Sequence, residues 1–143
     1  MSSTLVHLTV AAVEAIHREV LAAHGGAQGL REKALLESAV AAPQATMMGQ
    51  ALITQPIEVA AAYLYYLCQN RPFLDGNKRT ALASCLVFLE ANDQLPNDKL
   101  PIKEWEKLVL DVASSQLDRE QTTIRLRELI RSLGEDDQAR LPR

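Results

Sequence analysis

Residues 80–91 constrain the fold more than any other stretch, because almost every position there is apolar or small. A helix without a polar face must be buried on all sides, so other elements have to surround it. Hydrophobic residues make up 48% of the chain but aromatic residues only 4%, so the core is mainly aliphatic side chains and alanine. Such a core favours packed helices over sheets. The sequence therefore predicts an all-α, compact bundle around a buried central helix.

Apolar periodicity and helix-end signals predict the surrounding helices. Thr9 can cap a helix over 10–24 that ends at Gly25 and Gly26, and a second helix is expected over 30–42, with Pro43 closing it. A third begins at Pro56 and stops at residues 69–70, since Pro72 restricts the residue before it.

Two further apolar faces follow the central helix. One consists of Trp105, Leu108, Val109 and Val112, and the other of Leu126, Leu129, Ile130 and Leu133. Asp118 and Gln121 resemble a capping box, and Gly134 is expected to end the last helix. Residues 46–54 have no helical period and form either a loop or a short hairpin. We expect one domain over 1–143, with 135–143 a frayed, charged tail.

Charge and targeting signals exclude several classes of protein. The net charge is −3 and the pI is about 5.6, whereas a duplex-binding protein normally has a basic face. We see neither a signal peptide nor an apolar run long enough for a membrane span. Cys68 and Cys85 are isolated and lie in apolar stretches. These features predict a cytoplasmic protein with reduced cysteines that binds neither nucleic acid nor membrane.

The polar loop over 70–80 is the candidate functional site. It leads into the central helix, so backbone N–H groups and the helix dipole offer an anion site there. Gly76 permits close approach of a ligand, and Asn77, Lys78 and Arg79 add an amide and two cations. Cations oppose the dipole at a helix N-terminus by roughly 0.3–1 kcal/mol each, a penalty that a bound phosphate reverses.

Asp75 is the only carboxylate of this loop, and a divalent cation that bridges phosphates uses such a ligand. A purely structural explanation exists for each residue taken alone: Asp75 caps the helix, Lys78 and Arg79 pair with distant acids, and Phe73 fills the core. Their combination in one short loop favours a site for phosphate and magnesium.

The stretch Arg71-Pro72-Phe73-Leu74-Asp75-Gly76-Asn77-Lys78-Arg79 resembles the signature of Fic-domain proteins, which is His-Pro-Phe, two residues and Gly-Asn. It is most similar to the death-on-curing (Doc) branch, toxins of toxin–antitoxin modules, in which Asn-Lys-Arg replaces Asn-Gly-Arg. His17, Gly25-Gly26 and residues 29–32, 35–39 and 43–44 also resemble the Doc N-terminal region. The resemblance covers about residues 5 to 95.

The resemblance implies a compact Fic/Doc-like helical bundle and a role for each loop residue. Asp75 would hold Mg²⁺, Gly76, Asn77 and Arg79 would bind the phosphates of ATP, and Lys78 would fill the space that AMP-transferring enzymes keep open. The implied reaction moves the γ-phosphate to a hydroxyl of a host protein, elongation factor Tu. This modification would inhibit translation. Residues 46–54 would be the flap that aligns the target, and a cognate antitoxin would cover the groove with a helical segment.

Arg71 departs from the signature, because the family has its catalytic histidine at this position. Neutral imidazole accepts a proton near pH 7, whereas a guanidinium group stays protonated and cannot. Loss of a general base typically lowers the rate by about 10²–10⁴-fold. His17 lies on the same helical face as Val13 and Val20, which predicts a core residue rather than a substitute base.

Three explanations fit Arg71: an inactivating substitution, a natural member that has lost catalysis, or an active variant whose base comes from elsewhere. Three functions follow. The first is a nucleotide-dependent phosphotransferase of the Doc kind that is impaired at its base. The second is a non-catalytic pseudoenzyme that binds nucleotide or antitoxin. The third is an AMP transferase, which Lys78 disfavours.

Overall fold

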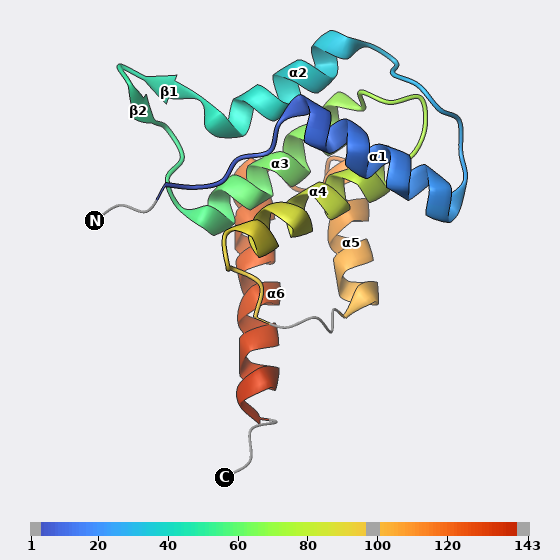
Figure 1. Ribbon diagram of the computed structural model, residues 1–143. Coiled ribbons are helices and arrows are strands. Elements are labelled where there is room, and N and C mark those ends of the chain that lie inside the picture. The colour runs from blue at the N-terminus through green and yellow to red at the C-terminus, as the bar shows by residue number, and fades with distance from the viewer. Residues whose placement is uncertain (1–3, 97–100, 140–143) are drawn as a thin grey trace.

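The computed structural model describes residues 4–96 and 101–139 and confirms the all-α bundle (Figure 1). The elements are α1 (Val10–His24), α2 (Lys33–Ala41), the short 3₁₀ helix η1 (Ala42–Gln44), β1 (Thr46–Met47), β2 (Gln50–Ala51), α3 (Pro56–Asn70), α4 (Asn77–Ala91), α5 (Ile102–Ala113) and α6 (Arg119–Ala139). Over the described ranges, no helix combines the length and the apolar character that crossing a membrane requires.

Local signals set several helix ends as predicted. The Thr9 hydroxyl accepts a hydrogen bond from the N–H of Ala12 at 3.0 Å and caps α1, and Gly25 ends that helix with φ 78°. At the start of α6, the N–H of Gln121 donates to the Asp118 carboxylate at 2.8 Å, and the N–H of Asp118 donates to the Gln121 side chain at 3.0 Å. The predicted capping box is therefore confirmed.

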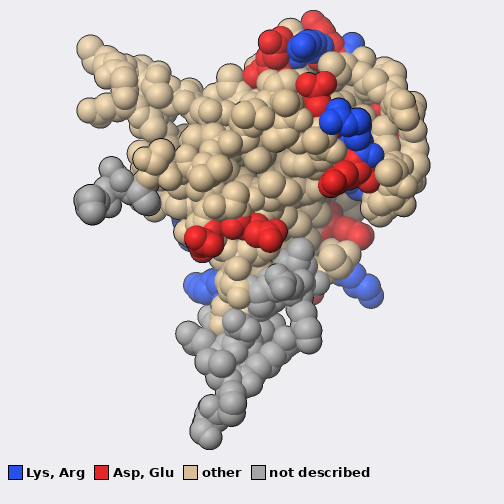
Figure 2. Space-filling model, in the orientation of Figure 1, with Lys and Arg blue, Asp and Glu red and all other residues tan. Residues whose placement is uncertain are grey.

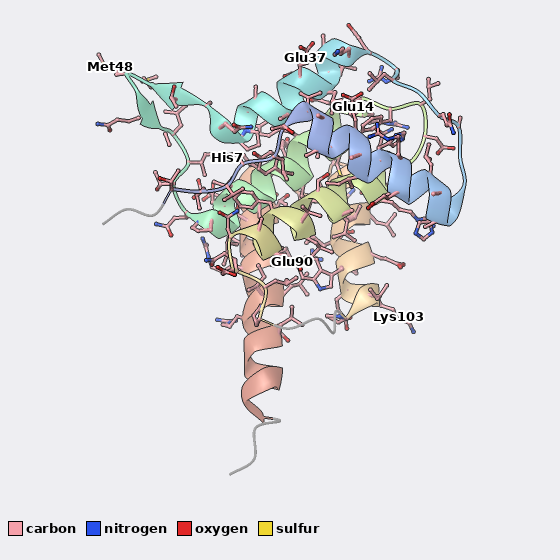
Figure 3. The ribbon with its side chains drawn as sticks, viewed as in Figure 1. His7, Glu14, Glu37, Met48, Glu90 and Lys103 are labelled. Atoms are coloured by element: carbon pink, nitrogen blue, oxygen red, sulfur yellow. The ribbon has the colours of Figure 1, made fainter. Side chains whose placement is uncertain are left out.

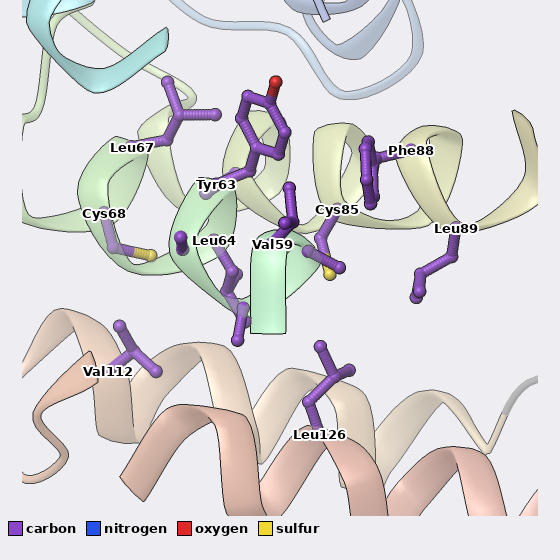
Figure 4. Packing of buried hydrophobic residues seen from close by; sticks show 14 of the residues in the cluster. Val59, Tyr63, Leu64, Leu67, Cys68, Cys85, Phe88, Leu89, Val112 and Leu126 are labelled. Atoms are coloured by element: carbon purple, nitrogen blue, oxygen red, sulfur yellow. The ribbon is translucent and has the colours of Figure 1, made fainter. Parts of the chain in front are cut away.

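Helix α3 is the most enclosed element of the bundle. It begins at Pro56, as predicted, and packs against α2, η1, α4, α5 and α6. Every residue over 59–64 has no exposed surface. Figure 4 shows side chains of α3 such as Tyr63 and Leu64 in the same cluster as Phe88 of α4 and Leu126 of α6. The position of α4 is thus set by its packing on α3.

Helix α4 differs from its prediction at its start and on one side. It begins at Asn77, three residues before the expected start. The earlier start was missed because the first turn consists of polar residues, which show no apolar periodicity. It is not buried on all sides: Val87 is 41% exposed, and Leu82 and Leu86 are partly exposed. The small side chains allow close packing on α3 and α1, but Leu82 and Leu86 line a groove towards α5.

The segment between α2 and α3 forms the hairpin that was one of the two alternatives. Thr46 pairs with Ala51 and Met47 with Gln50 in antiparallel register. Met48 and Gly49 both have positive φ, 52° and 78°, as a two-residue hairpin turn requires. The hairpin projects from the body with Met48 at its tip (Figure 3), and this uncharged projection contrasts with the charged surface elsewhere (Figure 2).

Two other predicted boundaries are wrong. Helix α2 starts at Lys33 rather than at residue 30, because Leu30 forms a bridge with Phe73, and Pro43 lies inside η1. Helix α6 continues through Gly134 to Ala139, since Gly134 does not adopt the left-handed conformation of a helix-ending glycine. Residues 135–139 belong to this helix, and 140–143 lie outside the described residues.

Candidate functional site

The signature loop joins the C-terminal end of α3 to the N-terminal end of α4. Arg71 ends α3 in the left-handed conformation, with φ 47° and ψ 60°, and the buried Pro72 follows it. Gly76, with φ 78°, precedes the first turn of α4. Two left-handed residues therefore define the bends on either side of the loop.

The loop is fixed to a segment about forty residues earlier in the chain. The carbonyl of Pro72 accepts the N–H of Arg31 at 2.7 Å, and the N–H of Leu74 donates to the carbonyl of Gly29 at 3.0 Å. The Arg31 guanidinium also donates to the carbonyls of Arg71 and Asn70, each at 2.8 Å. Arg31 thus satisfies carbonyl groups at the end of α3 that no helical N–H can reach.

The Asn77 side chain stabilises the loop from within. Its Oδ1 accepts the N–H of Phe73 and its Nδ2 donates to the carbonyl of Phe73, both at 2.9 Å. The amide predicted to bind phosphate is therefore already bonded to the loop. Asn77 can still offer its backbone N–H to a ligand.

Asp75 connects the loop to the end of α1. One carboxylate oxygen accepts the N–H of Gly76 at 3.0 Å, and the other accepts the N–H of Ala27 at 3.2 Å. The approach is close: a Cβ atom at Gly26 would lie 2.9 Å from this second oxygen. A carboxylate has about four lone-pair directions, so two remain for another ligand.

His17 of α1 contacts the same loop from the core and is a core residue, as predicted. It is 5% exposed, and its ring stacks on Phe73 with centroids 3.7 Å apart and an interplanar angle of 7°. Its Nε2 lies 2.8 Å from the carbonyl oxygen of Asp75. Because that oxygen can only accept, Nε2 carries the hydrogen, and this contact excludes Nε2 as a proton acceptor.

The N-terminus of α4 keeps three backbone donors free. Within the described residues, the N–H groups of Asn77, Lys78 and Arg79 have no acceptor. The first N–H group of α4 that has one is that of Thr80, which donates to the carbonyl of Gly76 at 2.9 Å. The exposed side chains of Arg71, Lys78 and Arg79 form no ion pair with any described carboxylate. Donors and cations are therefore available together, as an anion site requires.

These groups line an open groove of about 890 Å³. Its polar residues are His24, Arg71, Asp75, Asn77, Lys78, Arg79 and Glu106, and its apolar walls come from α1, α4 and α5. A smaller hollow of about 420 Å³ between α1 and residues 26–30 contains none of the signature cations. The predicted site residues thus lie around one cavity.

Of the charged or ring-nitrogen side chains in the groove, two were not predicted: His24 and Glu106. His24 is the last residue of α1 and Glu106 lies on α5, and no spacing in the sequence indicates that these two helices meet the loop. Arg31 was part of the resemblance but had no assigned role. Its only sequence signal was the run of residues 29–32.

The hairpin of β1 and β2 lies away from the groove. It precedes α3, whereas the loop follows α3, and fifteen helical residues separate their ends by about 22 Å. No hairpin residue lines the groove. A role in aligning the target remains a prediction.

The two cysteines are not nucleophiles of this site. Burial raises the pKa of the Cys68 thiol to about 12, although the positive charge of Lys78 acts in the opposite direction. Burial also raises the pKa of the Cys85 thiol, so both stay protonated thiols near neutral pH. The chemistry of the groove therefore belongs to its charged side chains and its backbone donors.

The comparisons with known proteins agree with this geometry. The model of the Fic/DOC family matches residues 7–89, which contain the loop and nearly all of α4. The chain is 40% identical over 97 residues to Toxin Doc of Mycolicibacterium smegmatis, an alignment that covers 67% of this chain and 74% of the relative. It is 34% identical over 86 residues to Protein kinase doc of Escherichia phage P1, covering 60% and 68%. The chain belongs to the Fic/DOC family.

Proposed function

We propose that the chain is a Doc-like toxin that transfers the γ-phosphate of ATP to a hydroxyl of a host translation protein. Its relatives named Toxin Doc and Protein kinase doc support both the toxin and the kinase assignment. The observation that carries the proposal is the group of three free N–H donors at the start of α4, beside Arg71, Lys78 and Arg79 in one groove. Elongation factor Tu is the proposed target by resemblance.

The phosphates bind at the start of α4. The backbone N–H groups of Asn77 and Arg79 donate to phosphate oxygens, and the Arg79 guanidinium supplies a bidentate, charge-assisted contact. Gly76 has no side chain between the phosphates and the helix end. Lys78 adds a second positive charge and occupies space that AMP transfer would need.

Asp75 is the proposed magnesium ligand, and its surroundings fit that role. Each of its oxygens already accepts one N–H, which orients the carboxylate while leaving lone pairs free. The described residues contain no cluster of three or more metal-binding side chains. One carboxylate together with phosphate oxygens and water is a common ligand set for Mg²⁺, which neutralises phosphate charge when bound.

Arg71 lowers turnover without preventing binding. Its guanidinium cannot take the proton of the attacking hydroxyl, but it adds a positive charge beside the phosphates. The backbone at this position is left-handed, and histidine is enriched several-fold there among residues other than glycine. Arg71→His therefore requires no change in the path of the loop.

Arg71 also supports a second candidate, a non-catalytic protein that binds nucleotide and its antitoxin. The antitoxin is a proposed partner in both cases, because a toxin of this kind is produced together with a neutralising protein. AMP transfer is the third candidate, and Lys78 argues against it.

Labelled ATP distinguishes the three functions. Purified Arg71→His protein is incubated with Mg²⁺, elongation factor Tu and ATP labelled at either the γ- or the α-phosphate, and parallel reactions contain a bacterial extract. We expect γ-label on protein and an increase of about 10²–10⁴-fold over the unchanged chain. The double variant Arg71→His/Arg79→Ala is the matched control and should label weakly.

Transfer from α-labelled ATP would identify an AMP transferase. No transfer from either label, with nucleotide binding intact by calorimetry, would contradict the phosphotransferase and favour the non-catalytic protein.

A further inference from the structure

We infer that His24 is the general base of this chain in place of the histidine that Arg71 replaces, an inference that rests on the proposed function. His24 lines the groove together with Arg71 and Arg79. It was not predicted as a site residue, because it lies at the end of α1, almost fifty residues before the loop.

The chain has three histidines, and the other two are already bonded. His17 donates through Nε2 to the Asp75 carbonyl, and Phe73 covers its ring. His7 bonds the Tyr63 hydroxyl through Nδ1 at 2.9 Å and lines neither of the cavities described above. His24 is exposed and has no hydrogen-bond partner among the described residues. Its ring nitrogens are therefore available to a substrate.

Residues on both sides of His24 place the C-terminal end of α1 next to the start of α4. A Cβ atom at Gly76 would lie 3.3 Å from Cδ2 of Leu21, and the N–H of Ala27 donates to Asp75. Leu21 and His24 are three residues apart, so they project from the same side of α1 on successive turns. His24 thus lies about one helical turn from the contact between α1 and Gly76.

The two carboxylates of the groove are weaker candidates for the base. Both oxygens of Asp75 accept backbone N–H groups, and this side chain is the proposed magnesium ligand. Glu106 lies farther along the groove: Gln69 donates to the carbonyl of Val112 at 2.7 Å, so the Val112 end of α5 adjoins α3. Six residues of helix separate Glu106 from Val112 by about 9 Å. The titratable and charged side chains that line the groove are His24, Cys68, Arg71, Asp75, Lys78, Arg79 and Glu106, and Cys68 is a protonated thiol near neutral pH.

The step is a proton transfer coupled to phosphoryl transfer. The oxygen of the target hydroxyl forms a bond to the γ-phosphorus, its proton moves to a neutral ring nitrogen of His24, and the bond between that phosphorus and the β,γ-bridging oxygen breaks. ADP leaves with the bonding electrons, and the imidazolium returns its proton to water. Arg71, Lys78 and Arg79 face the charge on the transferred group.

The test compares variants at positions 24, 71 and 106. The protein is incubated with γ-labelled ATP, Mg²⁺ and either elongation factor Tu or the extract protein that Arg71→His labels. We expect slow transfer by the unchanged chain and a further loss of about 10-fold in His24→Ala, partly restored by added imidazole, because a base displaced from the family position supplies only part of the roughly 10²–10⁴-fold contribution of a general base. Glu106→Gln should lose far less of the rate than His24→Ala does, whereas Glu37→Gln, at an exposed position of α2 that does not line the groove, should keep the rate of the unchanged chain.

The double variant Arg71→His/His24→Ala provides the control. It should react as fast as Arg71→His, because the histidine introduced at position 71 then takes the proton. Equal nucleotide affinity of His24→Ala and the unchanged chain shows that the lost rate is not lost binding.

Three results would overturn the assignment of His24. One is a His24→Ala rate within twofold of the unchanged chain, the second is a loss in Glu106→Gln instead, and the third is transfer by Arg71→His but none by the unchanged chain. Absence of transfer in every variant, Arg71→His included, contradicts the proposed function itself and is distinct from these results.

Discussion

Asn77 and Arg79 are two residues apart in the first turn of α4, and they contribute to the site in different ways. The Asn77 side chain is bonded to both backbone polar groups of Phe73, so it shapes the loop. The Arg79 side chain is exposed and forms no ion pair among the described carboxylates. Of the two side chains, only that of Arg79 is free to bind a ligand.

Arg79→Ala should weaken nucleotide binding by about 1.5–3 kcal/mol, the contribution of a charge-assisted hydrogen bond. Titration calorimetry with ATP and Mg²⁺ measures the change. Arg127→Ala is the matched control, because Arg127 is exposed on α6 and does not line the groove. Equal affinity of Arg79→Ala and the unchanged chain would exclude Arg79 from the site.

At the scale of the element, α4 depends on the backbone of its N-cap residue. Gly76 has φ 78°, and an added Cβ atom would lie 3.3 Å from Leu21. Gly134 lies inside α6 with ordinary helical φ, and no atom lies within 4 Å of an added Cβ. The same substitution should therefore have opposite effects at the two positions.

Gly76→Ala should lower the free energy of unfolding by about 1–2 kcal/mol, the cost of a left-handed conformation for a residue with a Cβ atom. Gly134→Ala should raise it by up to about 1 kcal/mol, because alanine favours a helix interior over glycine. Urea denaturation of both variants measures the two changes. Destabilisation by both would show that Gly134 has a role that its surroundings do not indicate.

The elements with local end signals could be predicted from the sequence. Each of these signals acts on its own helix. Helix α1 is bounded by Thr9 and Gly25, α3 begins at Pro56, and α6 begins after the capping box of Asp118 and Gln121, all as expected. The start of α2 could not be predicted, since it depends on the pairing of Leu30 with the distant Phe73. Gly134 was misleading because glycine ends a helix only where the backbone turns left-handed.

The same distinction applies to the site. The signature residues 71–79 could be located because they are contiguous, and all except Pro72 and Phe73 line the groove. His24 comes from α1, Glu106 from α5, and Arg31 from the connection between α1 and α2. Periodicity predicts the buried face of each helix but not which helix ends lie close together. The positions of these three residues near the loop could therefore be learned only from the structure.

At the scale of the whole molecule, the N-terminal segment is attached to the core through a titratable contact. The Tyr63 hydroxyl accepts the N–H of Leu8 at 3.1 Å, so its own hydrogen is free to go to Nδ1 of His7 at 2.9 Å. Burial lowers the pKa of His7 from 6.5 and raises that of Tyr63 to about 12. The segment crosses α3 at this contact (Figures 1 and 3).

Stability should therefore fall as the pH drops below 6.5. The unfolded chain binds a proton at His7 more readily than the folded chain, so the contribution of His7 is complete above pH 6.5 and is lost as the pH falls towards the lower folded pKa. Melting temperatures at about pH 7.5 and pH 5.5 should differ more in the unchanged chain than in His7→Gln. Asp111 does not contribute to this difference between pH 5.5 and 7.5. Its pKa is 3.8 in the unfolded chain and lower in the folded chain, so both states titrate below this range. An identical pH dependence of the two proteins would remove His7 as the cause.

The groove has walls from distant parts of the chain, with Val20 of α1 on one side and Ala113 of α5 on another. During synthesis on the ribosome, a nascent chain that has emerged only as far as α4 lacks the wall that α5 supplies. The groove therefore has no complete surface until most of the polypeptide has left the exit tunnel. Synthesis itself therefore delays the moment at which the proposed site is complete.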